Sequence, residues 1–248
     1  LPIGLASKVL NIPLFIHEQN SVMGSANRIL NLFSNLTFLG FPLASHKDKY
    51  VLSGNPLRKE MVKTTKGVEN KESLLVLGGS QGSLQLNDLV IKSLKNVEGL
   101  KEWHVYHQSG KLDLEEVKSF YVGSGLNHTV KDFFPNIEDY YNRASIIISR
   151  SGALTVSEIL HFKKPSIFLP LPWAIDNHQF HNAMHLNSIG LSEVIEAKDE
   201  NLDILTHKLQ EIISSKEKRD KMSDAAKLYE KRDSISIIIS SLYESFNK

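Results

Sequence analysis

The sequence contains no cysteine, and its charges almost cancel. The absence of cysteine excludes disulfide bonds, thiolate catalysis and zinc sites built on cysteine. Lys and Arg number 29 and Asp and Glu number 28, a net charge of +1, so we expect no nucleic acid partner. No apolar run approaches the roughly 20 residues that a helix needs to cross a bilayer. These absences favour a globular protein whose function does not depend on cysteine chemistry or on a strongly charged surface.

The sequence does contain short apolar runs that alternate with segments of helical periodicity. The predicted strands cover residues 13–17, 35–39, 49–52, 73–77, 103–107, 129–133, 145–149, 166–169 and 192–195. The predicted helices include residues 82–97, 153–161 and 177–189 and much of the chain from Glu200 onward. This alternation predicts an α/β fold with parallel sheets, in which ligands bind at the carboxyl ends of the strands.

The composition changes after Asn55, where a proline is followed by a cluster of Lys, Thr, Gly, Glu and Asn. We interpret residues 57–72 as a solvated linker, because such residues favour turns and exposed loops. The linker separates residues 1–56, the remnant of one domain, from a second domain over residues 73–232, and a last helix covers residues 233–248. The chain starts without Met, inside a helical pattern, so we expect an upstream segment to be missing.

The segment LLVLGGSQGSLQLND gives the strongest chemical signal. An apolar strand over residues 74–77 runs into the glycine-rich turn 78–82, and a helix follows. Such a turn points backbone N–H groups and the positive end of the helix dipole at an anion, and Ser80 can add a hydroxyl donor. The turn matches neither the Walker A pattern nor G-x-G-x-x-G. It predicts a diphosphate site, with a tight turn that binds nothing as an equal alternative.

The segment IIISRSGALTVSEIL has the same organisation. A strand over residues 146–148 is followed by Arg150, and a helix starts near Ala153. Arg150 and the start of this helix can hold negative charge, and the Glu158 carboxylate can accept hydrogen bonds from vicinal sugar hydroxyls. Two anion-binding loops on one sheet suggest a nucleotide. The alternative for Glu158 is a solvated or capping residue.

The segment HEQNSVMGSANR places His17 and Glu18 at the end of a predicted strand. It is not the H-E-x-x-H motif of zinc proteases, because position 21 is serine. Polar groups at the carboxyl end of a strand are typical of a ligand cleft. The alternative is that both side chains pair with neighbouring backbone.

The segment DNHQFHNAMH repeats histidine at helical spacing, at His178, His181 and His185. The first and third lie about 10 Å apart along a helix axis, too far to share one metal ion without other elements. We therefore interpret them as solvated or packing residues and expect no metal site. Gln179 and Asn182 can instead present amides to a sugar.

Six motifs occur in the order found in one known family: HEQNSVMGSANR, GNPLR, GGSQGS followed by LN, HQSGK, RSGALTVSE, and DNHQ followed by NA. On these motifs the chain resembles, from Leu1 to at least Glu196, the bacterial UDP-N-acetylglucosamine:N-acetylmuramyl-(pentapeptide) pyrophosphoryl-undecaprenol N-acetylglucosaminyltransferases. The resemblance implies a glycosyltransferase B fold, in which two Rossmann-like α/β domains face a cleft. Here the first domain would be incomplete, and the last helix would return to it.

The resemblance also implies a hexosyltransferase that uses no cofactor and no tightly held metal. The family transfers GlcNAc from UDP-GlcNAc to the muramyl C4 hydroxyl of the undecaprenyl-linked acceptor lipid I. Inversion at the anomeric carbon gives lipid II for peptidoglycan. The expected place is the cytoplasmic face of the bacterial inner membrane, with peripheral attachment and an anionic membrane surface as a further partner.

The donor-binding residues carry over by motif. In the family, Ser80 would meet the diphosphate, Glu158 the ribose hydroxyls, and the backbone of Phe134 the uracil. The full set that the resemblance implies is Asn20, Arg58, Ser80, Phe134, Ala153, Leu154, Thr155, Val156, Ser157, Glu158 and Gln179. Other polar positions of the family motifs are matched by His17, Glu18, Asn27, Asn87, Arg150 and Asn182.

The catalytic base is not assigned. The family's N-terminal loop GGTGGH, with its favoured catalytic histidine, has no counterpart here, so within the chain only His17 and Glu18 are candidates. A first alternative function is a truncated module that binds the donor without turnover. A second is an NAD-dependent oxidoreductase using the turn at Gly78, which the absence of G-x-G-x-x-G disfavours.

Overall fold

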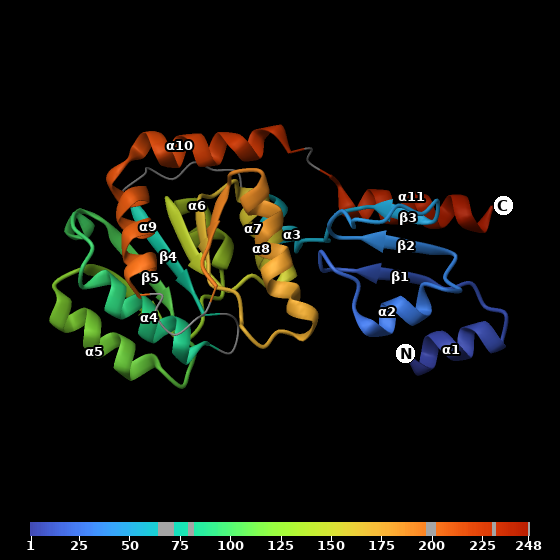
Figure 1. The fold of residues 1–248 in the computed structure, drawn as a ribbon, viewed down its shortest axis with the longest axis horizontal. Helices are drawn as coiled ribbons and strands as arrows, with labels where there is room; N and C mark the ends of the chain where they lie inside the picture. Colours follow the sequence, from blue (N-terminus) through green and yellow to red (C-terminus); the bar gives the residue numbers. More distant parts are fainter. Residues whose placement is uncertain (64–71, 79–81, 197–201, 230–231, 248) are drawn as a thin grey trace.

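The computed structural model describes residues 1–63, 72–78, 82–196, 202–229 and 232–247. They form a smaller and a larger lobe, each built on its own parallel sheet (Figure 1). Within these described ranges, no helix combines the length and the apolar character needed to cross a bilayer.

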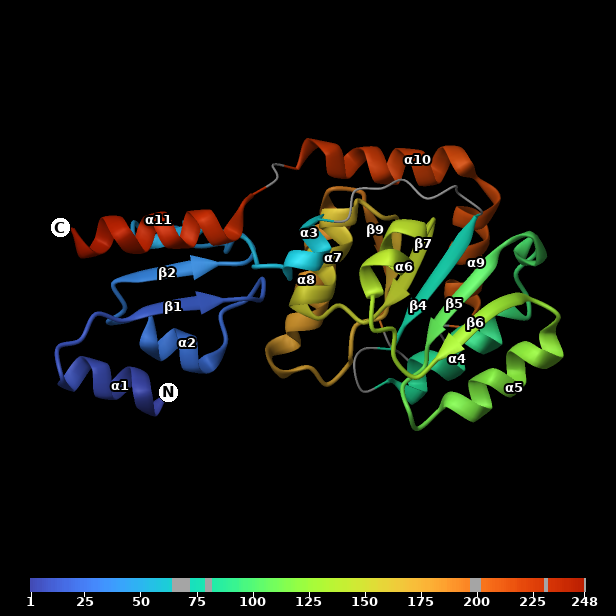
Figure 2. The ribbon, with the colours of Figure 1, turned by 180° about the vertical axis from the view of Figure 1, so that it is seen from behind.

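The smaller lobe has the strand order β1-β2-β3. Its elements are α1 (Pro2–Val9), β1 (Phe15–Glu18), α2 (Ser25–Leu30), β2 (Leu36–Leu39), β3 (Tyr50–Leu52) and α11 (Ser234–Phe246). Helix α11 lies along this sheet, where the rings of Phe15 and Phe246 are 5.5 Å apart. Strands β1 and β2 point toward the larger lobe, so the loop that follows β1 faces it (Figure 2).

The larger sheet has the strand order β6-β5-β4-β7-β8-β9, and all its pairs are parallel. Its strands are β4 (Ser73–Leu77), β5 (His104–Gln108), β6 (Asn127–Lys131), β7 (Ile146–Ser149), β8 (Ser166–Phe168) and β9 (Ser192–Val194). The order reverses between β4 and β7, as in a Rossmann fold. The helices that follow these two strands, α4 and α7, pack on opposite faces of the sheet, which leaves a crevice at the point of reversal, where such sheets bind ligands.

Helices cover both faces of the larger sheet. They are α3 (Lys59–Lys63), α4 (Leu84–Leu94), α5 (Leu114–Ser124), α6 (Ile137–Arg143), α7 (Ala153–Phe162), α8 (His178–Ser188), α9 (Leu202–Ser214) and α10 (Lys216–Ala225), with 3-10 turns over Leu100–Glu102, Ile175–Asn177 and Ala226–Leu228.

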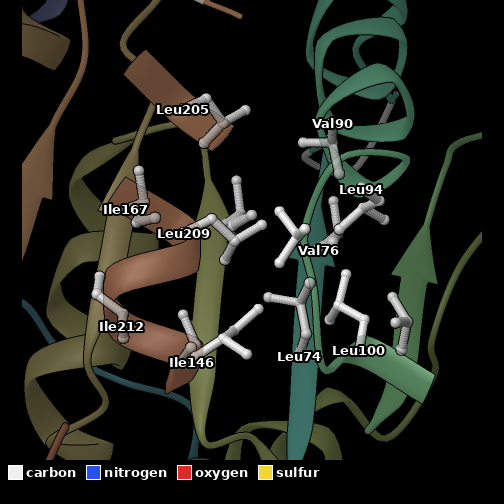
Figure 3. Packing of buried hydrophobic residues seen from close by; sticks show 14 of the residues in the cluster. Leu74, Val76, Val90, Leu94, Leu100, Ile146, Ile167, Leu205, Leu209 and Ile212 are labelled. Carbon is white, nitrogen blue, oxygen red and sulfur yellow. The ribbon is translucent and has the colours of Figure 1, made fainter. Parts of the chain in front are cut away.

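The core is divided by the sheet because successive strand residues point to opposite faces. Leu74 and Val76 of β4 pack with α4 and α9 on one face (Figure 3), and Leu75 and Leu77 pack with α6, α7 and α8 on the other. Each fully buried side chain of this kind contributes about 1.5–3 kcal/mol. The core thereby fixes the ends of β4 and β7, from which the crevice loops start.

The α/β fold expected from the sequence is confirmed, and a strand occurs at each predicted place. Two boundaries are wrong by two residues. The predicted strand 13–17 begins only at Phe15, because Pro13 has no N–H to donate to a sheet, and the predicted strand 129–133 lies earlier, at Asn127–Lys131. The apolar pattern continues past Lys131 because Phe134 is buried by stacking on Tyr140 after the strand has ended. Part of the predicted solvated linker is helix α3, whose Met61 is fully buried in the core of the larger lobe.

Candidate functional site

The turn after β4 needs its glycines. Gly82 has a φ of +84°, and a Cβ there would lie 2.5 Å from the Ser109 carbonyl oxygen; a Cβ on Gly78 would lie 2.9 Å from the Ser83 nitrogen. No side chain fits either position, and helix α4 begins after Ser83, whose Oγ caps it by accepting from the Leu86 N–H. Residues 79–81, including the predicted Ser80, lie outside the described residues.

Arg150 lies beside the start of α4, in the crevice. Its Nη2 and Nε donate to Ser83 Oγ at 2.9 and 3.2 Å, and its Nη1 donates to the Leu169 carbonyl at 2.8 Å. These acceptors are neutral, and burial lowers the pKa of Arg150 to about 10, which leaves it protonated at neutral pH. A positive charge at a helix N-terminus is suited to hold an anion.

A pocket of about 310 Å³ opens next to this arginine. It is lined by Arg58, Leu77, Gln108, Phe133, Ile137, Tyr141, Arg150, Leu154, Thr155 and Glu158. Its walls come from the linker, the ends of β4 and β5, the loop after β7, the segment that leads into α6, and helices α6 and α7. Four predicted donor-binding residues therefore share one cavity with the buried arginine.

Glu158 is the acid of this pocket. Tyr141 donates its hydroxyl hydrogen to Glu158 Oε2 at 2.8 Å, and burial raises the pKa of the Glu158 carboxyl, although Tyr141 and Arg58 partly counter that rise. Burial also raises the pKa of Tyr141, so it remains a donor. A half-desolvated carboxylate with one fixed donor can accept further hydrogen bonds from a ligand's hydroxyls.

The predicted segment 153–158 lies on helix α7, so its side chains point in different directions around the helix. Leu154, Thr155 and Glu158 line the pocket, whereas Ala153 and Val156 are buried in the core cluster. Ser157 faces the other lobe, because its Oγ accepts a hydrogen bond from Asn55 at 2.9 Å. The structure thus gives the core residues a packing role, and any ligand contact they make comes from their backbone.

Phe134 and Gln179 do not line the pocket. The Phe134 N–H donates to Gln108 Oε1 at 2.9 Å, and its ring is fully buried. Gln179 Oε1 accepts from the Leu171 N–H at 3.1 Å. A uracil contact by Phe134 and a sugar contact by Gln179 stay predictions.

Glu18 organises the loop that follows β1. Its Oε1 accepts from the backbone and side-chain nitrogens of Asn20, and its Oε2 accepts from Gly24 N and Asn27 Nδ2, both at 2.9 Å. The residue is only 3% exposed. A carboxylate saturated by four donors is a structural group, which favours the backbone-pairing interpretation over a catalytic base. His17 contacts the Gly54 carbonyl through Nε2 at 3.2 Å.

Asn20 has both ends of its amide engaged. Its Nδ2 donates to Glu18, and its Oδ1 accepts from Asn182 Nδ2 of the other lobe at 3.0 Å. The side chain therefore joins the lobes in this structure, and its predicted donor contact stays a prediction.

The three histidines of α8 are not gathered around a common centre. Nε2 of His185 lies 3.2 Å from the Tyr229 hydroxyl oxygen, and its ring packs edge-on against Phe41. Burial lowers the pKa of His185, so its ring is neutral. Among the described residues, no three His, Asp or Glu side chains could hold a metal ion together.

Sequence reasoning missed five residues that line the pocket: Leu77, Gln108, Phe133, Ile137 and Tyr141. Tyr141 gave no signal, because its contact with Glu158 joins two helices. Asn55 belongs to the motif GNPLR, in which the resemblance assigns a donor-binding role to Arg58 alone; Asn55 contacts Gln19 and Ser157 between the lobes and does not line the pocket.

The Rossmann strand order of the larger sheet and a second parallel sheet whose strands point toward it are the architecture of the glycosyltransferase B fold. The model of the glycosyltransferase family 28 C-terminal domain matches residues 73–238. The chain belongs to glycosyltransferase family 28, among the relatives of the N-acetylglucosamine transferases described next.

A Sulfurihydrogenibium protein is 35% identical over 253 residues, which cover 99% of this chain and 70% of that protein. A Saccharophagus degradans protein is 36% identical, over 91% of this chain and 59% of its own length. Both are named UDP-N-acetylglucosamine--N-acetylmuramyl-(pentapeptide) pyrophosphoryl-undecaprenol N-acetylglucosamine transferase. The crystal structure of MurG from Acinetobacter baumannii matches with a TM-score of 0.84 and 27% identity, over 98% of this chain and 71% of that one. The chain thus spans 59% to 70% of the curated relatives' length.

Proposed function

We propose that the chain supplies the donor side of a GlcNAc transfer from UDP-GlcNAc to the muramyl C4 hydroxyl of lipid I, which gives lipid II with inversion. The names of the relatives support this donor and a lipid-linked muramyl acceptor. The observation that carries the proposal is the pocket at the switch point, where Arg58, Thr155 and Glu158 meet Arg150.

The pocket matches the parts of a nucleoside diphosphate sugar. The Glu158 carboxylate accepts hydrogen bonds from the vicinal ribose hydroxyls, since Tyr141 already holds one of its oxygens in place. Arg150 and the N-terminus of α4 face the diphosphate.

The same groups assist the chemical step. The acceptor oxygen attacks the anomeric carbon while the bond from that carbon to the diphosphate oxygen breaks. Negative charge grows on the leaving UDP, and Arg150 with the α4 dipole stabilises it. The proton of the acceptor hydroxyl goes to a base, which stays unassigned because Glu18 is saturated by loop hydrogen bonds.

Calorimetric titration with UDP-GlcNAc tests the donor site. We expect saturable binding, with UDP-glucose and NAD as weaker competitors. Glu158→Ala should weaken it by about 1.5–3 kcal/mol, because hydrogen bonds to a charged group are lost. The matched control is Glu115→Ala, which removes an exposed carboxylate from α5, outside the pocket. Equal affinity of the two variants would contradict the role of Glu158, and NAD binding tighter than UDP-GlcNAc would contradict the proposed donor.

We extend the proposal to peripheral attachment at the cytoplasmic face of the inner membrane, with anionic lipid as partner. Helix α1 exposes Ile3 (87%) and Val9 (84%) near Lys8, a combination that favours an anionic lipid surface. In a sedimentation assay with anionic vesicles, the wild-type protein should pellet with the vesicles and the Ile3→Asp protein should stay in the supernatant. Leu112→Asp, at an equally exposed leucine of the larger lobe, is the control, and loss of both variants alike would count against α1.

The alternative is donor binding without turnover, and the relatives' names do not favour it. A transfer assay with lipid I separates the two: release of UDP together with lipid II formation supports the transferase, whereas donor binding without either product supports the binding module.

A further inference from the structure

Asn182 of α8 joins the two lobes and is completely buried. Its Oδ1 accepts from the Ser21 N–H at 2.8 Å, across 161 residues of sequence, and its Nδ2 donates to Asn20 Oδ1 at 3.0 Å and to the Ser151 carbonyl at 3.2 Å. Asn20 and Ser21 belong to the loop after β1, and Ser151 belongs to the loop after β7. One amide therefore holds the carboxyl ends of both sheets together.

Two further polar contacts cross the same junction. Asn55 Nδ2 donates to the Gln19 carbonyl at 3.0 Å and to Ser157 Oγ at 2.9 Å. Arg28 and Asp176 form an ion pair at 3.0 Å, but both side chains are exposed, so solvent screens it and it contributes little. The buried amides are therefore the polar contacts of the junction that solvent does not screen, and Phe41 of the smaller lobe adds an apolar contact with His185 of α8.

The loop that Asn182 contacts is also held from within its own lobe. Glu18 holds it from inside through Asn20, Gly24 and Asn27. When the lobes separate, water reaches the Ser21 N–H and the Ser151 carbonyl and replaces Asn182 as their partner, so each hydrogen bond of the junction contributes only its modest net stabilisation. The hydrogen bonds of Asn182 therefore favour the closed junction without locking it.

We propose that Asn182 is a positioning residue that sets the closed arrangement of the two lobes and, through it, the shape of the donor pocket. Its target Ser151 lies directly between Arg150 and the start of α7, which carries Thr155 and Glu158 into the pocket. Movement of the small lobe is therefore transmitted to the residues that line the pocket. The link to the donor rests on the proposed function; the link between the lobes does not.

The experiment measures the distance between the lobes directly. Because the chain has no cysteine, spin labels attach only at introduced sites, here Asp48→Cys in the smaller lobe and Glu217→Cys in the larger, both exposed. Double electron–electron resonance gives the distribution of distances between the two labels, and calorimetry gives the affinity for UDP-GlcNAc. The test variant is Asn182→Ala. The matched control is Asn187→Ala on the same helix, whose Nδ2 donates to the Ser192 carbonyl inside the larger lobe.

We expect the label distance to broaden or lengthen in Asn182→Ala and to stay unchanged in Asn187→Ala. The UDP-GlcNAc affinity of Asn182→Ala should fall by about 3- to 10-fold, because a smaller share of molecules is in the closed state. If Asn182→Ala does not fold, Asn20→Ala carries the test, since it removes one bond of the junction from a half-buried position.

An unchanged distance distribution in the folded variants overturns the proposal, even with weaker donor binding, since Asn182 would then act on the donor alone. A broadened distribution with unchanged affinity overturns the link to the pocket. A broadened distribution in a protein whose wild type binds no UDP-GlcNAc refutes the proposed function and supports the junction.

Discussion

Acidification is expected to destabilise the larger lobe through His107, a fully buried residue of β5. Its Nε2 lies 3.0 Å from Asn87 Oδ1, and its Nδ1 lies 3.0 Å from the Tyr121 hydroxyl oxygen. Asn87 Nδ2 donates to the Ser109 carbonyl and to Asp113, so Asn87 Oδ1 is the acceptor for His107 Nε2–H. Nδ1 then accepts a hydrogen bond from the Tyr121 hydroxyl. A second proton on the ring would have to bind at Nδ1 and would therefore break this hydrogen bond.

The magnitude follows from the pKa of this ring. Burial lowers the pKa of His107 from 6.5 to about 3. Below about pH 6.5 the unfolded chain binds a proton that the folded chain refuses, so the free energy of unfolding falls as the pH falls through this window. The slope approaches about 1.4 kcal/mol per pH unit, and the loss between about pH 7.5 and pH 5 is therefore about 2 kcal/mol. This loss is a substantial part of the roughly 5–15 kcal/mol that is the usual free energy of unfolding of a domain.

Urea unfolding of the wild type and of His107→Gln, followed by circular dichroism, measures this loss. Glutamine keeps one donor and one acceptor but does not fit the site as the ring does, so the variant is less stable at neutral pH. Because glutamine binds no proton, the stability of the variant does not depend on this titration. The difference between the two proteins should narrow by about 2 kcal/mol on going to about pH 5. The other histidines affect both curves equally. A difference that stays constant with pH would refute the reasoning.

Three further outcomes are expected. Gly82→Ala should lower the free energy of unfolding by at least about 1 kcal/mol, since its φ is positive and its Cβ would meet Ser109; Gly123→Ala, with open space around it, should not, and urea unfolding compares them. Leu209→Ala should cost about 2–5 kcal/mol in the same assay, because it leaves a cavity in the core. UDP-GlcNAc affinity should fall as the pH drops through the raised pKa of Glu158, and calorimetry across pH should show a flat profile for Glu158→Gln.

The sequence predicted the fold well because its signals are local. Residues 74–77 form a continuous apolar run that ends in glycine, which is sufficient to define a buried strand and a sharp turn. The error at β6 has the same origin. Phe133 and Phe134 prolonged the apolar pattern, but after the strand the chain turns and Phe134 packs on Tyr140, a contact that strand periodicity does not contain.

From the sequence, the residues of α7 that line the pocket could be identified only as members of one motif. That motif contains Thr155 and Glu158 together with Ala153 and Val156. Their different roles depend on which side of α7 meets the sheet, and this is decided by the packing of α6, α7 and α8 on the larger sheet. Tyr141 could not be found beforehand for the same reason.

By itself, the sequence determined the succession of strands and helices, the glycine turn before α4 and the family motifs, since each depends on residues within one or two turns of one another. Only the tertiary structure decided that β4 and β7 are neighbours, so that the turn at Gly82 and the guanidinium of Arg150 share one crevice. It alone decided that Asn182 holds Ser21. Such contacts depend on how whole layers pack, and the sequence neighbours of a residue do not contain that information.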